Sequence, residues 1–244
     1  MELKIFKDYD ELSFAACEEI IRIIKTKTDA ILCLATGQSP ILTYQLLVEK
    51  IIAEKIDISN ITFIGLDEWV GIPPEMEGSC QHFLQTRLFK PLKVSASQVY
   101  LFDALANDTD KECKRMNKII KEKGGIDFML VGVGMNGHIG FNEPGVAINN
   151  YAHVIELDET TKAVGQKKYF DKPVTISKGI TLGLQDFLDA RFTIMIANGI
   201  KKADIIKKTM EEPINTNIPA TLMRMHKNSL LMVDEEAASL LDKK

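Results

Sequence analysis

Short apolar, β-branched runs alternate along the chain with longer segments in which apolar residues recur every three or four positions. Such runs are typical of buried strands, and the longer period is typical of helices that cover a sheet. The apolar runs predict strands over residues 30–35, 61–66, 98–102, 128–133, 192–197 and 229–233. The periodic segments predict helices over residues 9–27, 41–54, 80–89, 108–122 and 201–210.

This alternation predicts an α/β fold: a single-domain, doubly wound, mostly parallel sheet with helices on both faces. No linker rich in Pro, Gly or Ser divides residues 1–244, so we expect the whole chain to form one domain. Residues 146–179 are less regular, and we expect them to form a lid or a small subsidiary hairpin near the site. Ligands of open α/β sheets bind at the carboxyl ends of the strands, so residues that follow strands are the first candidates for a site.

Composition argues against several other classes of protein. The net charge of -4 argues against a nucleic-acid partner. No apolar stretch approaches the roughly 18 residues that cross a bilayer, and the amino terminus lacks the apolar core of a signal peptide, so we expect no membrane contact and a cytoplasmic location. The 4 cysteines are scattered without a CxxC pair, so neither a disulfide framework nor a zinc site is indicated.

The first candidate turn, residues 35–40, follows a predicted strand and opens a predicted helix at Pro40. Free backbone N–H groups at a helix start, together with the hydroxyls of Thr36 and Ser39, suit a phosphate. The lysine of a nucleotide-binding P-loop is missing, so a nucleoside triphosphate is not implied. The alternative is that Ser39 simply caps the helix.

The second candidate turn, residues 66–71, places Asp67, Glu68 and the single tryptophan after a predicted strand. A carboxylate at this position can take a proton from carbon. The alternative for either acid alone is helix capping, because acids are common at helix starts.

The third candidate turn, residues 132–145, is rich in glycine and carries Asn136, His138 and Glu143. A carboxylate that orients an imidazole and favours its charged form makes a general acid/base near neutral pH. A lone histidine is more often structural, but the flanking glycines and Glu143 favour the functional interpretation. Two acid/base centres beside a phosphate turn suggest proton transfer on a sugar phosphate.

These motifs, Ala35-Thr36-Gly37-Gln38-Ser39-Pro40, Leu66-Asp67-Glu68-Trp69-Val70-Gly71 and Gly137-His138-Ile139-Gly140-Phe141-Asn142-Glu143-Pro144-Gly145, together resemble the glucosamine/galactosamine-6-phosphate isomerase/deaminase family. The resemblance runs nearly end to end. Within the family the chain looks closest to the galactosamine-6-phosphate branch, through residues 33–37, 42–44, 47–51 and 179–184.

The resemblance implies an aldose-to-ketose isomerisation coupled to loss of ammonia from an aminosugar phosphate, without a metal or an organic cofactor. It implies that His138 assists ring opening, that Glu143 and Asn136 orient and tune it, and that Asp67 takes the proton from C2. Position 136 is aspartate in well-known members. Asn136 can bond the imidazole without adding negative charge, so we expect His138 to be less biased toward its protonated form.

The resemblance also assigns the phosphate ligands. Thr36, Gly37 and Ser39 match the family's phosphate loop, and Lys202 matches a phosphate-binding lysine at a helix start. The family's phosphate-contacting arginine falls within residues 166–170, where this chain has only lysine, so a point charge replaces a bidentate fork. Lys168 is our choice for that position, with Lys167 as the alternative.

The favoured substrate is galactosamine-6-phosphate, giving tagatose-6-phosphate and ammonia; the alternative is glucosamine-6-phosphate, giving fructose-6-phosphate. A 6-phosphogluconolactonase is less favoured, because those enzymes typically show Asp-Glu-Arg where this chain has Asp67-Glu68-Trp69. A non-catalytic sugar-phosphate sensor is also less favoured, because the acid/base set is intact and no helix-turn-helix segment precedes the first predicted strand.

Overall fold

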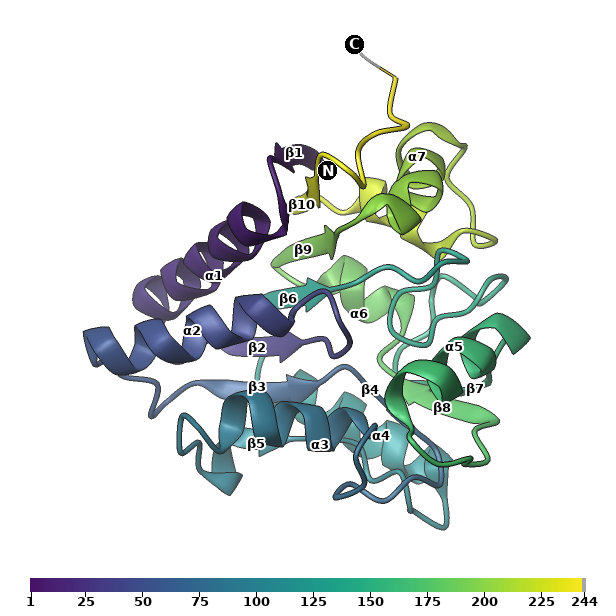
Figure 1. Ribbon diagram of the computed structural model, residues 1–244. Coiled ribbons are helices and arrows are strands. Elements are labelled where there is room, and N and C mark those ends of the chain that lie inside the picture. The colour runs from purple at the N-terminus through teal and green to yellow at the C-terminus, as the bar shows by residue number, and fades with distance from the viewer. Residues whose placement is uncertain (243–244) are drawn as a thin grey trace.

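The computed structural model describes residues 1–242. Its centre is a sheet of seven parallel strands in the order β1-β10-β9-β6-β2-β3-β5 (Figure 1). The strands are β1 (Glu2–Phe6), β2 (Ile31–Leu34), β3 (Thr62–Gly65), β5 (Val99–Tyr100), β6 (Phe128–Val131), β9 (Phe192–Ala197) and β10 (Ser229–Asp234).

Helices cover both faces of this sheet. They are α1 (Tyr9–Thr26), α2 (Ile41–Glu54), α3 (Cys80–Leu84), α4 (Thr109–Glu122), α6 (Leu184–Asp189) and α7 (Ala203–Glu211). A further helix, α5 (Glu159–Tyr169), does not pack on either face. Four short turns of other helical types also occur: a π-helical turn, η1 (Gln85–Phe89), and the 3₁₀ turns η2 (Ala96–Gln98), η3 (Ile200–Lys202) and η4 (Pro219–Met225).

The central sheet has a hydrophobic core on each face, because successive side chains of a strand point to opposite faces. Phe128 and Leu130 of β6 pack in the core that α1, α2 and α3 cover. Met129 and Val131 pack in the core that α4, α6 and α7 cover. Both sets are fully buried, which explains why these strands appear in the sequence as continuous apolar runs.

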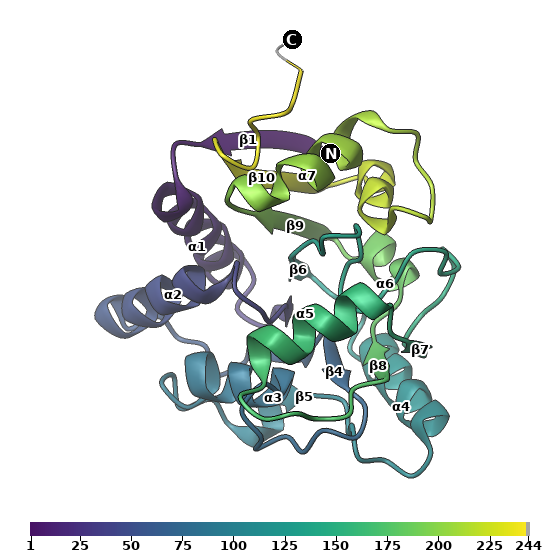
Figure 2. The ribbon, with the colours of Figure 1, turned by 45° about the vertical axis from the view of Figure 1, so that its right-hand side comes forward.

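A second sheet of three antiparallel strands, in the order β4-β8-β7, lies beside the first. Its strands are β4 (Asp67–Trp69), β7 (His153–Glu156) and β8 (Lys178–Thr181). Helix α5 connects β7 to β8 and lies across the carboxyl ends of the central strands (Figure 2).

The structure confirms the predicted fold class, a doubly wound, mostly parallel sheet in a single domain. All six predicted strands are present, although the predicted helix over 80–89 changes from α to π geometry at Gln85. Strands β1, β4, β7 and β8 were not predicted, because they are short and half polar. Within 146–179, β7 and the start of β8 are antiparallel neighbours, but α5 rather than a tight turn connects them. That this segment acts as a lid stays a prediction.

The strand order reverses between β2 and β6. From β2 the chain continues outward to β3 and β5, and then returns to β6 before it continues outward on the other side. In open α/β sheets such a reversal leaves a crevice outside the carboxyl ends of the two strands, where ligands bind. The turns after β2 and β6 are two of the three turns that the sequence singled out.

Candidate active site

A cavity of about 490 Å³ opens at this reversal. It is lined by the turns after β2 and β6, by β4, by parts of α3 and α5, and by the turn η3 that precedes α7. Eight of the nine predicted site residues line it: Thr36, Gly37, Ser39, Asp67, Asn136, His138, Lys168 and Lys202. The ninth, Glu143, lies behind the cavity wall with only 4% of its surface exposed.

The turn after β2 is positioned by Tyr9 of α1. The Tyr9 hydroxyl donates to the carbonyl of Ser39 at 2.9 Å and accepts from the N–H of Leu42 at 3.1 Å. Helix α2 has Pro40 as its N-cap and no side-chain capping hydrogen bond. The alternative of Ser39 as a helix cap is therefore wrong, and its hydroxyl is available to a ligand in the cavity.

Asp67 and Glu68 have different roles because they are successive residues of β4. Glu68 has no exposed surface. Its carboxylate accepts hydrogen bonds from the backbone N–H groups of Trp69, Cys80 and Gln81 at 2.8 to 2.9 Å, and from the Ser79 hydroxyl at 2.9 Å. Glu68 therefore fixes the start of α3 against β4, while Asp67 lines the cavity.

The Asp67 carboxyl has the properties of a general base at neutral pH. Burial raises its pKa, the charge of Glu68 raises it further, and the Cys80 thiol opposes this with a hydrogen bond, so that the pKa lies at about 7. Its Oδ1 atom has no hydrogen-bond partner among the described residues. A base is most effective when its pKa lies near the operating pH.

The turn after β6 presents the His138 imidazole. Gly134 permits this, because a Cβ atom there would lie 2.4 Å from the imidazole ring. The imidazole Nδ1 lies 3.2 Å from the Thr161 hydroxyl and 3.5 Å from Glu143 Oε2. Burial alone would raise the pKa of Glu143, but its interactions with His138, Thr161 and Asn136 outweigh burial and lower it. The Glu143 carboxylate is therefore charged where it lies beside the imidazole.

Asn136 acts differently from the expectation that it bonds the imidazole. Its side-chain amide donates to Glu143 at 2.9 Å and accepts from the backbone N–H of His138 at 3.2 Å. Asn136 therefore positions the carboxylate and the turn. The side chain that contacts the imidazole together with Glu143 is Thr161 of α5, which the sequence did not single out because a lone threonine in an irregular segment gives no signal.

Comparison with known proteins places this site in a family. The family of glucosamine-6-phosphate isomerases/6-phosphogluconolactonase matches residues 7–232. A glucosamine-6-phosphate deaminase of Clostridium perfringens is 37% identical over 242 residues, which cover 99% of this chain and 100% of the relative. The Escherichia coli (strain K12) protein named "Putative deaminase AgaI" is 38% identical over 95% of this chain and 91% of its own length.

The chain belongs to the glucosamine-6-phosphate isomerase/6-phosphogluconolactonase family. It is therefore an enzyme. A solved structure described as a monomeric glucosamine-6-phosphate deaminase superposes with a TM-score of 0.95 at 32% identity, over 98% of this chain and 100% of that one. The 6-phosphogluconolactonase of Trypanosoma brucei shares the fold, with a TM-score of 0.77 at 20% identity over 99% of this chain and 98% of that one.

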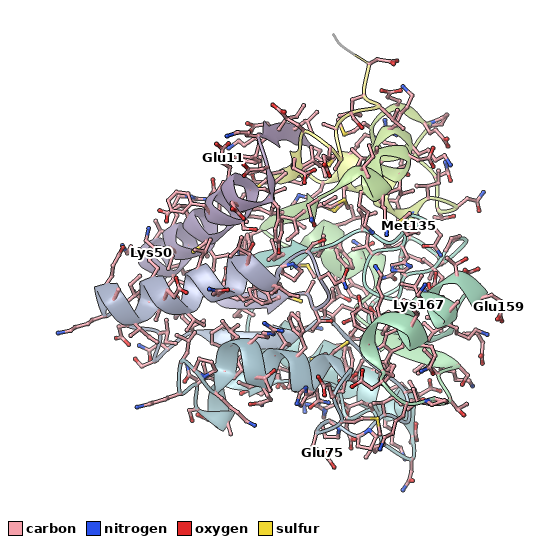
Figure 3. All side chains as sticks on the ribbon, viewed as in Figure 1. Glu11, Lys50, Glu75, Met135, Glu159 and Lys167 are labelled. Atoms are coloured by element: carbon pink, nitrogen blue, oxygen red, sulfur yellow. The ribbon has the colours of Figure 1, made fainter. Side chains whose placement is uncertain are left out.

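Four cationic side chains line the cavity: Lys168 and Lys202, which the sequence predicted, and Arg87 and Lys201, which it did not single out. Lys202, in η3 just before α7, donates to the carbonyl of Val133 at 2.5 Å. Burial, and then the charge of Lys168, lower the pKa of Lys202 to about 8. Lys168 is therefore close to Lys202, and it lines the cavity. Lys167, which Figure 3 labels on α5, is exposed and is not part of the lining.

Residues 1–242 contain no group of three or more His, Cys, Asp or Glu side chains arranged to bind a metal ion. Within the same residues, no helix has the length and apolar character to span a membrane.

Proposed function

We propose that the enzyme converts galactosamine-6-phosphate and water into tagatose-6-phosphate and ammonia, with glucosamine-6-phosphate to fructose-6-phosphate as the alternative. One observation carries the proposal: a carboxyl group with a pKa of about 7, Asp67, shares a cavity with the imidazole of His138 and with Lys202. A base, an acid/base imidazole and a cation are the groups that isomerisation of a sugar phosphate requires. A charged sugar phosphate does not cross a bilayer freely, so we place the activity in the cytoplasm.

The first step is ring opening, and His138 is the group for it. The imidazole takes the proton from the anomeric hydroxyl and gives it to the ring oxygen, so that the C1–O5 bond breaks and the aldehyde forms. Glu143 and Thr161 orient the imidazole from behind. Glu143 also stabilises the charged form that exists between the two proton transfers.

The second step is proton transfer between carbons. Asp67 takes the proton from C2, and the resulting enolamine is protonated at C1. The iminium at C2 then adds water and releases ammonia, which leaves a ketose 6-phosphate. Asp67 suits this step because its carboxylate is desolvated and has one oxygen without a protein partner. Desolvation makes a carboxylate a stronger base.

The substrate phosphate belongs at the turn after β2. Thr36, Gly37 and Ser39 provide hydroxyl and backbone N–H donors there, and Lys168 and Lys202 provide charge. The choice of galactosamine as the amino sugar is supported by the resemblance of residues 33–37 and 179–184 to the galactosamine branch. The names of relatives at 37% identity favour the alternative, glucosamine.

Ammonia release from purified enzyme tests the proposal. The two aminosugar phosphates are assayed in parallel, with hydrolysis of 6-phosphogluconolactone as a third assay. We expect ammonia from galactosamine-6-phosphate at the higher kcat/KM. Preference for glucosamine-6-phosphate would leave the mechanism and change the substrate, whereas lactone hydrolysis without ammonia would refute the deaminase function.

A His138→Gln variant tests the ring-opening role. We expect steady-state ammonia release to fall by about 100-fold, because the reaction then depends on spontaneous ring opening. The open-chain fraction of the substrate should still react rapidly, so rapid mixing should show a small burst before the slow phase. Unchanged steady-state turnover, or loss of the burst together with the slow phase, would contradict the role.

A further inference from the structure

Tyr169, the last residue of α5, has a hydroxyl group without a function in the mechanism above. Its ring packs on Trp69, with the centroids 6.3 Å apart. The hydroxyl lines the cavity and lies 3.3 Å from the position that a Cβ atom on Gly37 would occupy. Within residues 1–242 it makes no hydrogen bond to another protein group, so it is free to bond a ligand.

Tyr169 also shares the cavity with the general base, Asp67. The Tyr169 pKa is raised to about 12 by burial first, and then by the groups of Cys80 and Asp67. Cys80 connects the turn after β2 to the general base, since its thiol accepts a hydrogen bond from the Thr36 hydroxyl at 3.3 Å and donates one to the Asp67 carboxylate. Tyr169 is therefore neutral at physiological pH, beside the phosphate turn and within electrostatic reach of Asp67.

The strand order relates the turn after β2 to Asp67. Leu34 of β2 pairs with Gly65 of β3, and Thr36 and Asp67 each lie two residues beyond this last pair, with Asp67 on β4 of the smaller sheet. A hexose 6-phosphate with its phosphate on the turn after β2 and its C2 at Asp67 has C3 to C6 between them, in the cavity that Tyr169 also lines.

We propose that the Tyr169 hydroxyl bonds the substrate hydroxyl at C4 and so determines which C4 epimer the enzyme prefers. The proposal rests on the function proposed above. We favour the C4 hydroxyl over the C3 hydroxyl because the Tyr169 hydroxyl lies close to Gly37, in the turn that binds the phosphate. The C3 hydroxyl lies further from that turn, since C3 is bonded to C2, the carbon that Asp67 deprotonates. An epimer with the opposite configuration points its oxygen away from a donor fixed in this position.

The structure fixes Tyr169 through its backbone. Gly78, in the loop between β4 and α3, has φ of +102°, and a Cβ atom there would lie 2.3 Å from the Tyr169 carbonyl oxygen. This close approach requires glycine. Phe170, the next residue, is buried beside the same loop. A polar group in a fixed position discriminates between epimers more strongly than a mobile one, because the wrong epimer leaves it without a partner.

A Tyr169→Phe variant tests the proposal, since it removes one oxygen and keeps the ring that packs on Trp69. We expect kcat/KM for the preferred epimer to fall about tenfold, the value of one neutral hydrogen bond, and kcat/KM for the other epimer to change less than about twofold. Inhibition by inorganic phosphate should stay the same. Tyr100→Phe is the control, because Tyr100 lies on β5 and does not line the cavity.

The outcomes separate three cases. An equal fall for both epimers would overturn the proposal, since the hydroxyl would then not distinguish them. Weaker inhibition by inorganic phosphate at an unchanged epimer ratio would overturn it in favour of a phosphate ligand. Failure of the proposed function is a different result, because the enzyme with Tyr169 intact would then release ammonia from neither epimer.

Discussion

An Asp67→Asn variant is expected to lose ammonia release by at least about 10³-fold and yet to be more stable than the parent enzyme at pH 8. Activity falls because the amide cannot take the C2 proton. Stability rises because the folded protein holds the Asp67 carboxyl in surroundings that disfavour its charge. An amide of the same shape carries no charge in either state.

The sign of the stability effect follows from the pKa values. The folded pKa of Asp67 is about 7, against the ordinary value of 3.8, so the folded state binds this proton more tightly than the unfolded state. The parent enzyme therefore loses stability as the pH rises from about 4 to about 7, and the variant does not. A pKa difference of about three units corresponds to about 4 kcal/mol in the free energy of unfolding. We expect about half of that value, because the Asp67 carboxylate faces an open cavity where solvent screens its charge.

Thermal unfolding as a function of pH, together with ammonia release at pH 8, checks both parts. The expected gain of about 2 kcal/mol corresponds to a rise in Tm of about 4 to 8 °C at pH 8, and it should vanish near pH 4. Glu75→Gln is the matched control, since Glu75 is exposed in the loop after β4 (Figure 3) and should show neither effect. A variant that is less stable at pH 8 would contradict the electrostatic account, and residual activity above about 10% would exclude Asp67 as the base.

The fold could be predicted from the sequence because the central strands are buried on both faces. Residues 128–131 and 192–197 are continuous apolar runs for that reason, and the helices between them have a clear period. The positions of the polar turns followed from the same pattern, since the carboxyl ends of parallel strands meet at one edge of the sheet.

The sequence could not predict the contacts that complete the site. Thr161, Cys80 and Tyr169 come from α3 and α5, and they reach the cavity only because the small sheet of β4, β8 and β7 positions these helices. Those three strands have four residues or fewer, too few for a clear period. Likewise, the different roles of Asp67 and Glu68 depend on β4 being a strand rather than a turn, which only the pairing with β8 establishes.

A Lys202→Met variant is expected to lose about 100-fold in kcat/KM, mostly through KM, because a charge-assisted hydrogen bond to phosphate is worth about 3 kcal/mol. Methionine keeps most of the length of the chain and removes the charge. Lys167→Met is the matched control, because Lys167 is exposed on α5 outside the cavity lining and should lose less than about twofold.

The pH profile shows whether Lys202 acts through its charge. Burial, and then Lys168, lower the pKa of Lys202 to about 8, so the free enzyme loses this charge as the pH rises through 8. Asp67 loses its basic form as the pH falls through about 7. We therefore expect kcat/KM of the parent enzyme to be highest between these two values and to fall on both sides. The phosphate of a bound substrate stabilises the Lys202 ammonium, so kcat should decline only at a higher pH than kcat/KM.

The Lys202→Met variant should lose the fall in kcat/KM on the alkaline side, near pH 8, and keep the fall on the acid side. An unchanged alkaline fall in the variant would show that another group titrates there, and an unchanged KM would show that the phosphate binds elsewhere.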